Sequence, residues 1–485
     1  MKKYKLEITV FLCGALTMML ELVAARVLAP YVGSSNLIWT TIIGIMLIGM
    51  SLGYWVGGKL ADKNPNIKTV SEFLFIACIT TSIIPISEVV IIDNLIKICN
   101  ELVIVAIISA TLIFGIPSFM LAAISPMAVK IKNEEEKAVG KISGKISSLS
   151  TIGSIIGTFV AGFILIPNIG VRNIILISSI LLWIMGICLY NNKNKKTVSI
   201  MIVILIAIIG INIYSYKLFK DKNPDIIKDV DSEYNRIWVK EIKNENINYK
   251  TLQVDTGLES YIDQNTGEMG AEYLKYFDLF DYYNENANSV LMIGGAAYTY
   301  PIHYLDKYSN KTIDVVEIDE KMTEIAQEEF GLDTNNPNLK IHHQDGRSFL
   351  NYNDTKYDAV LIDAFKGLNA PFELTTYEAM QKVRNNLKDN GIVITNIISA
   401  LEGEEDDFIK YEYSTYKAVF DDVKLFKVRD TEDNQTQNII LIGIKEKTSI
   451  NERKSSEYKE LLDRKITGFK STKPVITDDY APIGD

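Results

Sequence analysis

The chain has 485 residues, more than one ordinary domain needs, and 48% of them are hydrophobic. Its formal net charge of −10 at pH 7 argues against a general nucleic-acid binder, which would need a basic face. The few cysteines and histidines do not follow the spacing of a metal site, so no metal is expected; they are Cys13, Cys78, Cys99, Cys188, His303, His342 and His343.

The composition divides the chain into two parts. Residues 1–215 are dominated by Ile, Leu, Val, Ala and Gly, and the remainder is rich in Asp, Glu, Lys, Asn and Tyr. A bilayer core requires roughly 20 apolar residues per helix. The first part therefore predicts a polytopic α-helical membrane bundle of about seven spans, over residues 7–30, 36–58, 71–92, 102–130, 147–167, 172–191 and 197–215.

Lysines predict the orientation of these spans, because loops rich in Lys and Arg stay in the cytoplasm. They precede the first span and follow the second, fourth and sixth, as at Lys2, Lys63, Lys137 and Lys195. A multi-pass protein of the cell membrane with a cytoplasmic N-terminus is expected. An odd number of spans would place the second half outside the cell. That placement conflicts with a cytosolic nucleoside substrate, so the side of the second half stays open.

The second half begins with a polar segment, residues 216–233, which we interpret as a linker. Alternating segments within residues 234–288 predict a small antiparallel β module followed by a helix over 272–283. Residues 289–447 alternate strands and helices and end in a strand pair, and residues 448–485 form a C-terminal extension. The alternation predicts a doubly wound, Rossmann-type sheet like that of class I S-adenosylmethionine-dependent methyltransferases.

In "VLMIGGAAYTYP" an apolar strand ends at Gly294 and Gly295, which allow a ligand to approach the backbone without a Cβ. Nucleoside binders that use this turn usually carry more glycine. Glu317 ends the next strand about 20 residues later, where a carboxylate can accept both ribose hydroxyls. These features predict a nucleoside site at the carboxyl ends of the strands.

Two further carboxylates end the following strands. Asp345, directly before Gly346, could accept from the exocyclic amine of adenine, and Asp363 faces the same crevice. Each of these carboxylates alone could instead be a helix N-cap. Three successive strands that each end in a carboxylate favour the nucleoside interpretation.

Several segments together carry a resemblance to a known family, and they extend over nearly the whole chain. They are "ELVAARVLAPYVGSSNLIWT", "GMSLGYWVGGKLADK", "VVEID", "DGRSFL", "YDAVLIDAF", "LTTYEAM", "NIISALEG" and "TDDYAP". The sequence resembles the polyamine aminopropyltransferase (spermidine synthase) family, in the branch fused to an N-terminal membrane domain.

The resemblance implies transfer of an aminopropyl group to a polyamine acceptor. The co-substrate would be decarboxylated S-adenosylmethionine, or S-adenosylmethionine itself, with no permanently bound cofactor. Asp363 matches the family's base, Glu317 the ribose ligand, and Asp345 and Gly346 the adenine side; Asn235 stands where a glutamine is usual. The implied partners are nucleoside and amine substrates, the lipid bilayer and, as a candidate, a second copy in a homodimer.

Two positions depart from the family pattern. Ala297 replaces an aspartate that holds the amino group of the donor, and Lys366 replaces an aspartate of the polyamine site. A lysine would repel a diamine. Two alternatives therefore stay open: another S-adenosylmethionine-type transferase acting on a membrane-borne acceptor, and a non-catalytic nucleoside or polyamine sensor or transport-associated protein.

Overall fold

The computed structural model describes residues 4–99, 101–190, 195–243, 248–364, 371–403, 405–446 and 456–482. The chain forms two compact units, residues 1–238 and 239–485. The division falls a little after the predicted linker, 216–233, rather than before it.

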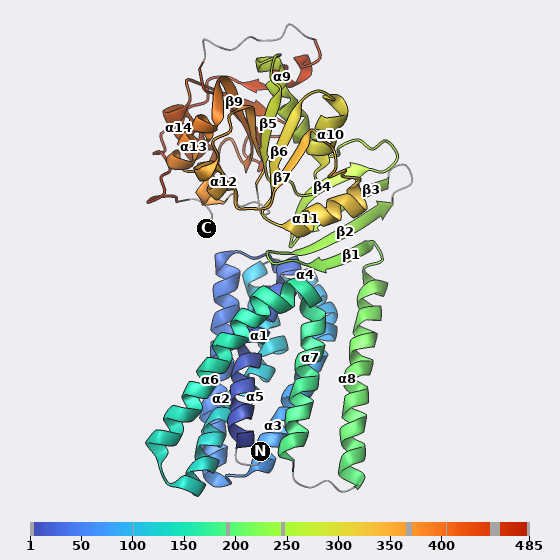
Figure 1. Ribbon diagram of the computed structural model, residues 1–485, viewed down its shortest axis with the longest axis vertical. Helices are drawn as coiled ribbons and strands as arrows, with labels where there is room; N and C mark the ends of the chain where they lie inside the picture. The colour runs from blue at the N-terminus through green and yellow to red at the C-terminus, as the bar shows by residue number, and fades with distance from the viewer. Residues whose placement is uncertain are drawn as a thin grey trace. The chain divides into compact units, whose positions relative to one another are not determined.

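The first unit is a bundle of long apolar helices (Figure 1). Its helical elements are α1 (Lys5–Val32), α2 (Asn36–Lys63), α3 (Ile67–Ser87), η2 (Glu88–Ile92), α4 (Asp93–Ile98), α5 (Leu102–Glu136), α6 (Val139–Val160), η3 (Ala161–Leu165), α7 (Ile166–Leu189) and α8 (Lys195–Lys222). Within the described residues, 6 helical stretches are long and apolar enough to cross a membrane.

This number is lower than the predicted seven because two predicted segments fall in one continuous stretch of 51 residues, Val139–Leu189. At about 1.5 Å per residue a straight helix of that length would far exceed a bilayer core. The stretch is bent, because Gly170 has the non-helical angles φ 76° and ψ 159°.

Contacts with α1 show that α6 and α7 run in opposite directions. A Cβ on Gly153 would lie 2.0 Å from the Phe11 oxygen and one on Gly157 2.4 Å from the Ala15 oxygen, so α6 runs parallel to α1. The Lys5 Nζ donates to the Cys188 oxygen at 2.7 Å, so the end of α7 meets the start of α1. The stretch therefore folds back on itself, as Figure 1 also shows.

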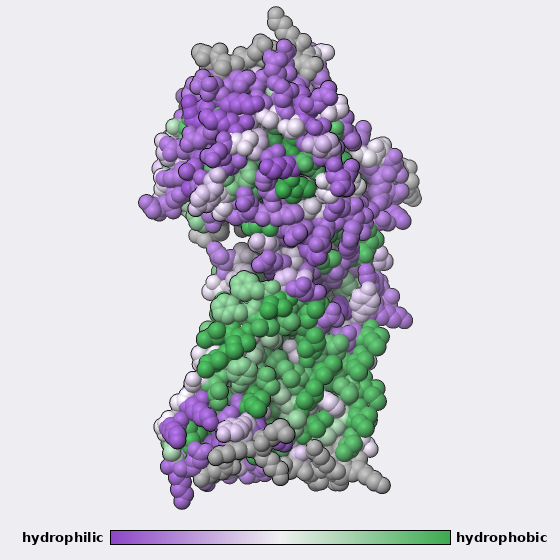
Figure 2. Space-filling model, viewed as in Figure 1, coloured by the Kyte–Doolittle hydropathy of each residue, from purple (hydrophilic) through white to green (hydrophobic). Residues whose placement is uncertain are grey.

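Glycines bring other helices of the bundle into close contact, as their spacing predicts. A Cβ on Gly53 would lie 2.3 Å from the Phe119 oxygen, and one on Gly57 2.4 Å from the Ala123 oxygen. Side chains such as Leu47, Phe163 and Ile206 are exposed on the outside of the bundle, where Figure 2 shows a wide hydrophobic surface. Such a surface fits a lipid environment.

The predicted linker is mostly regular structure. Helix α8 continues to Lys222, and strand β1 (Ile226–Asp231) begins soon after it. A four-stranded sheet has the order β1-β2-β3-β4, with β2 at Arg236–Lys243, β3 at Asn248–Val254 and β4 at Gly257–Asp263. Strands β3 and β4 pair antiparallel, in agreement with the predicted β module.

The second unit is an α/β domain with a methyltransferase-like fold, which confirms the predicted fold class. Its helical elements are η4 (Glu272–Asp278), α9 (Leu279–Tyr283), α10 (Thr299–Lys307), α11 (Glu320–Ile325), η5 (Ala326–Phe330), α12 (Gly346–Tyr352), η6 (Phe372–Leu374), α13 (Tyr377–Asn386), α14 (Asp407–Val419) and α15 (Lys459–Asp463). Its sheet contains β5 (Ser289–Ile293), β6 (Thr312–Val316), β7 (Leu339–His342), β8 (Tyr357–Ile362), β9 (Leu387–Ser399), β10 (Asp422–Lys427), β11 (Gln437–Ile444) and β12 (Lys465–Ile466).

The sheet has the order β12-β10-β11-β9-β8-β5-β6-β7, and both of its faces are covered. Alternate residues of β5 point to opposite faces. Val290 packs in a core with Phe277 and Tyr304, whereas Leu291 packs with Phe349 and other residues of the second face. Strand β12 belongs to this sheet, so the predicted C-terminal extension, 448–485, is in part integral to the domain.

The strand order places a crevice at the carboxyl ends of β5 and β8. Strand β5 pairs in parallel with β6 on one side and with β8 on the other. The chain passes to β6 and β7 first and then crosses to β8, so the order reverses at β5. Ligands of open α/β sheets bind at such a reversal point.

Candidate active site

A cavity of about 300 Å³ lies at this crevice in the second unit. Its lining includes Gly294 and Gly295 from the end of β5, Asp363 from the end of β8, Tyr273 from η4 and Asn396 from β9. Three residues predicted from the sequence thus meet in one place. The parallel strands bring them together because their carboxyl ends share one edge of the sheet.

Asp363 is a cavity acid whose two oxygens are both held by side-chain donors. The Tyr273 hydroxyl donates to its Oδ2 at 2.9 Å, and the Asn396 Nδ2 donates to its Oδ1 at 3.1 Å. Burial raises the pKa of Asp363 to about 6, although the hydrogen bonds from Asn396 and Tyr273 oppose that rise. Burial and the negative charge of Asp363 also raise the pKa of Tyr273, so this phenol stays a donor.

A second amide orients Asn396. The Asn438 Nδ2 donates to the Asn396 Oδ1 at 3.0 Å, which leaves the Asn396 Nδ2 to face Asp363. Tyr273, Asn396 and Asn438 were not among the site residues predicted from the sequence. A signal was present for Asn396, since it is a polar residue inside the apolar strand "GIVITNI".

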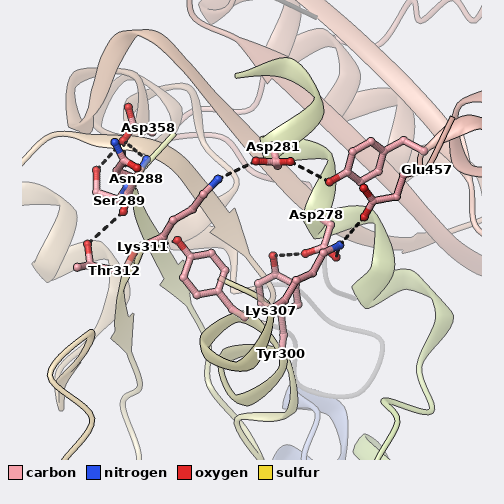
Figure 3. A network of polar contacts seen from close by, with 12 residues as sticks. Asp278, Asp281, Asn288, Ser289, Tyr300, Lys307, Lys311, Thr312, Asp358 and Glu457 are labelled. Atoms are coloured by element: carbon pink, nitrogen blue, oxygen red, sulfur yellow. Dashed lines mark hydrogen bonds and ion pairs between the residues drawn. The ribbon is translucent and has the colours of Figure 1, made fainter. Parts of the chain in front are cut away.

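Behind the cavity, Tyr300 is held by a polar network shown in Figure 3. Its hydroxyl donates to the Asp278 Oδ1 at 3.1 Å, and the Lys307 Nζ donates to the Asp278 Oδ2 at 2.9 Å. Burial raises the pKa of Asp278, but the contacts with His303 and Lys307 outweigh it and lower that pKa overall. His303 contributes to this network at 3.2 Å from Asp278.

The glycine turn is shaped by packing within the protein. Gly294 has φ +92°, and a Cβ there would lie 2.4 Å from the Asp363 oxygen. A Cβ on Gly295 would lie 2.8 Å from the Tyr298 ring. Ala296 and Tyr298 have φ values of 45° and 56° without being glycine, which is unfavourable by roughly 1–2 kcal/mol each. Glycine at 294 therefore lets this turn approach Asp363, and glycine at 295 leaves room for the Tyr298 ring.

Glu317 holds the turn in place. Its Oε2 accepts from the Gly295 N at 2.8 Å and from the Ala296 N at 3.0 Å, and its Oε1 accepts from the Asp319 N at 3.0 Å. The side chain is buried, and burial raises its pKa against the effect of these backbone donors. The predicted ribose ligand is thus a structural anchor of the glycine turn.

Asp345 and Gly346 lie at the end of β7. Asp345 is exposed and caps α12, because its Oδ1 accepts from the Ser348 N at 2.8 Å. A Cβ on Gly346 would lie 2.7 Å from the Ile293 Cγ2, so glycine lets this turn pack on the end of β5. Neither residue lines the cavity of about 300 Å³.

Three other predicted positions have different outcomes. Asn235 belongs to the first unit, where its backbone N donates to the Ser232 Oγ at 2.9 Å in the turn between β1 and β2. Ala297 is fully buried and does not line the cavity, whereas Ala296 does. Lys366 lies outside the described residues.

Charged groups on the cavity lining are mostly acidic. Glu259, Glu272 and Asp363 are its carboxylates, and Arg429 is the one cation among the described lining residues. The Arg429 Nε donates to the Glu272 Oε2 at 3.0 Å, so part of that cationic charge is offset. The balance of charge favours a cationic ligand over an anionic one.

Comparison with known proteins identifies the family. Residues 271–447 match the spermine/spermidine synthase domain. The matched region is thus a spermine/spermidine synthase (polyamine aminopropyltransferase) domain. Members of this family use decarboxylated S-adenosylmethionine as aminopropyl donor. The matched region begins at Ala271, just before Tyr273, and includes Asp363 and Asn396.

Two relatives extend the similarity beyond this domain. The "Probable polyamine aminopropyl transferase" of Bifidobacterium longum is 28% identical over 279 residues, covering 52% of this chain and 60% of the relative. The chain thus spans less than two thirds of that relative. "Polyamine aminopropyltransferase 2" of Aquifex aeolicus is 22% identical over 411 residues, covering 80% of this chain and 78% of the relative.

Solved structures also include similar proteins. A probable spermidine synthase from Corynebacterium glutamicum superposes with a TM-score of 0.44 at 18% identity, covering 53% of this chain and 99% of that structure. Spermidine synthase from Thermotoga maritima superposes with a TM-score of 0.38 at 17% identity, covering 53% of this chain and 82% of that structure.

Proposed function

We propose that this protein is a membrane-bound aminopropyltransferase that moves an aminopropyl group from decarboxylated S-adenosylmethionine to an amine, with Asp363 as the base. The observation that carries the proposal is the position of Asp363. It lines the cavity at the reversal point of the sheet, and both of its oxygens are held by side-chain donors. A base must be oriented as well as basic.

The reaction requires a neutral amine. The acceptor nitrogen attacks the carbon beside the sulfonium, a C–N bond forms, and the C–S bond breaks, so methylthioadenosine leaves with the electron pair. An alkylammonium, with a pKa near that of lysine at about 10.4, has no lone pair until a base removes a proton. With a pKa of about 6, Asp363 is mostly ionised at neutral pH and can accept that proton.

The acidic lining supports an amine acceptor. The aspartate expected at 297 is missing, and Ala297 faces the protein interior. Glu259 on β4 and Glu272 on η4 supply carboxylates to the cavity from other elements. We infer that these two residues attract the cationic amine in place of the family's usual acids.

The nucleoside is assigned to the turn at Gly294 and Gly295, with Glu317 on the ribose and the Asp345–Gly346 turn on adenine. Each carboxylate oxygen can accept about two hydrogen bonds. The Glu317 Oε2 already accepts two and its Oε1 accepts one. Glu317 thus has room for one ribose hydroxyl in this conformation, and a second contact requires the turn to move.

Two alternatives follow from the departures at Ala297 and Lys366. The protein could transfer a different group from S-adenosylmethionine to a membrane-borne acceptor, or bind a nucleoside or polyamine without catalysis. Calorimetry on the full chain in detergent separates the first alternative from aminopropyl transfer, with decarboxylated S-adenosylmethionine, S-adenosylmethionine and methylthioadenosine as ligands, and a turnover measurement separates the second. Aminopropyl transfer predicts binding of methylthioadenosine and of the decarboxylated donor. Binding of S-adenosylmethionine alone would favour the first alternative.

For the membrane half we propose seven crossings rather than six, because α6 and α7 run in opposite directions within one long helical stretch. The lysines at the end of α2, at the end of α5 and at the start of α6 then lie with Lys5 on the cytoplasmic side. Residues 239–485 would lie on the opposite side of the cell membrane and would meet substrates there.

Cysteine labelling tests this topology. Cys99 and Cys188, which are not buried, are first replaced by serine. Tyr352→Cys, at a position that is 86% exposed, should react with an impermeant maleimide in intact cells. Lys141→Cys, exposed at the start of α6, is the matched control and should react only after lysis. The opposite pattern would contradict the proposed orientation.

A further inference from the structure

The motif "TDDYAP" near the C-terminus has no part in the proposed reaction, yet it is fixed in the fold. The buried Ile476 accepts from the Tyr377 N at 2.8 Å through its oxygen, and its N donates to the Thr415 Oγ1 at 3.1 Å. Thr477 and Tyr480 then pair across a short bridge. The segment is thus anchored between α13 and α14, and it presents Asp478.

Asp478 connects two other motifs of the sequence. Its Oδ2 accepts from the Arg347 Nη2 at 2.7 Å, and its Oδ1 accepts from the Thr376 Oγ1 at 2.6 Å. Its backbone N donates to the Glu378 Oε2 at 3.0 Å. Arg347 belongs to "DGRSFL" and Thr376 to "LTTYEAM", so three segments far apart in the chain meet at one carboxylate.

Arg347 continues this connection. Its Nη1 donates to the Glu373 oxygen at 3.1 Å and to the Thr376 Oγ1 at 3.1 Å. Its side chain is only 16% exposed. The guanidinium therefore joins the start of α12 to the end of η6, and the geometry is directional because the donors of arginine form a rigid plane.

The groups held in this way adjoin the assigned nucleoside site. Arg347 directly follows Asp345 and Gly346 at the end of β7. Leu374, at the end of η6, would contact a Cβ on Gly346 at 3.5 Å, so η6 packs on the same turn. A shift of η6 or α12 would move this turn relative to Gly294 and Asp363.

We propose that Asp478 is a positioning residue for nucleoside binding, acting through Arg347 and Thr376 on the Asp345–Gly346 turn. The inference rests on the proposed function, because it takes that turn to be the adenine side of the donor site. Asp478 does not contact the cavity. It should therefore affect the affinity for the nucleoside and leave the chemical step unchanged.

Affinity and turnover measured together test this role in the full-length protein. The variants are Asp478→Asn, Arg347→Lys and the double variant. Arg384→Lys is the control, because Arg384 and Asp421 form an ion pair in the same unit at 3.4 Å, without contact to the turn in the described residues. Calorimetry gives the Kd of methylthioadenosine, and methylthioadenosine release gives kcat and the KM of the decarboxylated donor.

We expect each single variant to raise Kd and KM by roughly 3- to 30-fold, the usual range for coupled contacts, with kcat unchanged. The double variant should add little to the single ones, because both residues act through one contact. Equal Kd in Asp478→Asn and wild type would overturn the inference. A fall in the melting temperature and in kcat with KM unchanged would also overturn it, since that pattern indicates only lost folded protein. Failure of the wild type to bind methylthioadenosine would instead overturn the proposed function itself.

Discussion

Glu317 follows β6 and Asp363 follows β8 of the same sheet, but the two carboxylates accept hydrogen bonds from different kinds of donor. Glu317 accepts three hydrogen bonds from backbone N–H groups and holds the glycine turn. Asp363 accepts two hydrogen bonds, both from side chains, and lines the cavity. An acid at a strand end can thus be a scaffold or a reactive group, and its donors distinguish the two.

The difference has a physical basis. Backbone donors belong to the fold, so a carboxylate that they bind stabilises a loop whenever the protein is folded. Tyr273 and Asn396 each donate one hydrogen bond to a different oxygen of Asp363, and a further lone pair on each oxygen stays available for a substrate. Glu317 and Asp345 are therefore expected to affect structure together with binding, whereas Asp363 is expected to affect catalysis alone.

The largest effect is expected for Asp363→Asn. Turnover should fall by about 100-fold or more, the usual contribution of a general base. Methylthioadenosine affinity should be retained, because the Asn oxygen can accept from Asn396 and its amide can donate to Tyr273. Kinetics of methylthioadenosine release and calorimetry measure the two quantities.

Asp358→Asn is the matched control at the opposite end of β8. Asp358 accepts from the Asn288 and Ser289 N–H groups and from Lys388, part of which Figure 3 shows. Its removal should lower the melting temperature and leave kcat unchanged. Similar loss of turnover in both variants would remove the base role from Asp363.

The second prediction concerns pH. The kcat/KM of the wild type should fall about tenfold per unit below a pH of about 6, as Asp363 becomes protonated. Its raised pKa also has a stability sign: the penalty for ionising Asp363 is absent below pH 4 and grows as the pH rises towards 6. Asp363→Asn should therefore melt no lower than wild type near neutral pH. A marked fall in its melting temperature would show that the buried charge is stabilising.

Glu317→Gln should have a smaller effect on activity and a clear effect on stability. The NH₂ group of the Gln would face either the Asp319 N–H or the Gly295 and Ala296 N–H groups. Donors would then face donors, and buried polar groups would be left unpaired. We expect a loss of about 1–3 kcal/mol in the free energy of unfolding, together with about tenfold weaker methylthioadenosine binding. Chemical denaturation and calorimetry measure both. Loss of affinity without loss of stability would mean that Glu317 is a ligand contact and not an anchor.

The smallest effect is expected at Asp345, where two substitutions separate cap from ligand contact. Asparagine caps a helix about as well as aspartate, whereas alanine destabilises it by about 1 kcal/mol. Asp345→Asn should therefore keep the stability and weaken methylthioadenosine binding by roughly threefold, at the low end of a single hydrogen bond. Unchanged binding in Asp345→Asn would leave Asp345 as a helix cap only.

Much of the second unit could be predicted from its sequence. The alternation of apolar strands with helices gave the parallel sheet, and Gly294, Glu317 and Asp363 each lie at the strand ends where the pattern placed them. Local signals suffice for these features, because strand ends and glycine turns are encoded within a few residues.

The partners of Asp363 could not be predicted in the same way. Tyr273 lies 90 residues before it and Asn396 33 residues after it, so only the folded sheet brings them together. Ala297 lies between Ala296 and Tyr298, which both adopt left-handed conformations. Alanine and tyrosine rarely adopt that conformation, so the sequence does not predict the interior location of Ala297. By contrast, the bend at Gly170 falls between the predicted spans 147–167 and 172–191, where the sequence pattern placed a break.

Product analysis tests the central claim most directly. Purified full-length protein is incubated with decarboxylated S-adenosylmethionine and putrescine, and both products are quantified by mass spectrometry over time. Aminopropyl transfer predicts spermidine and methylthioadenosine in equal amounts, and far less of both with Asp363→Asn. Methylthioadenosine without an aminopropylated amine, or no product from a wild type that binds the donor, would contradict the assignment of this cavity as an aminopropyltransferase site.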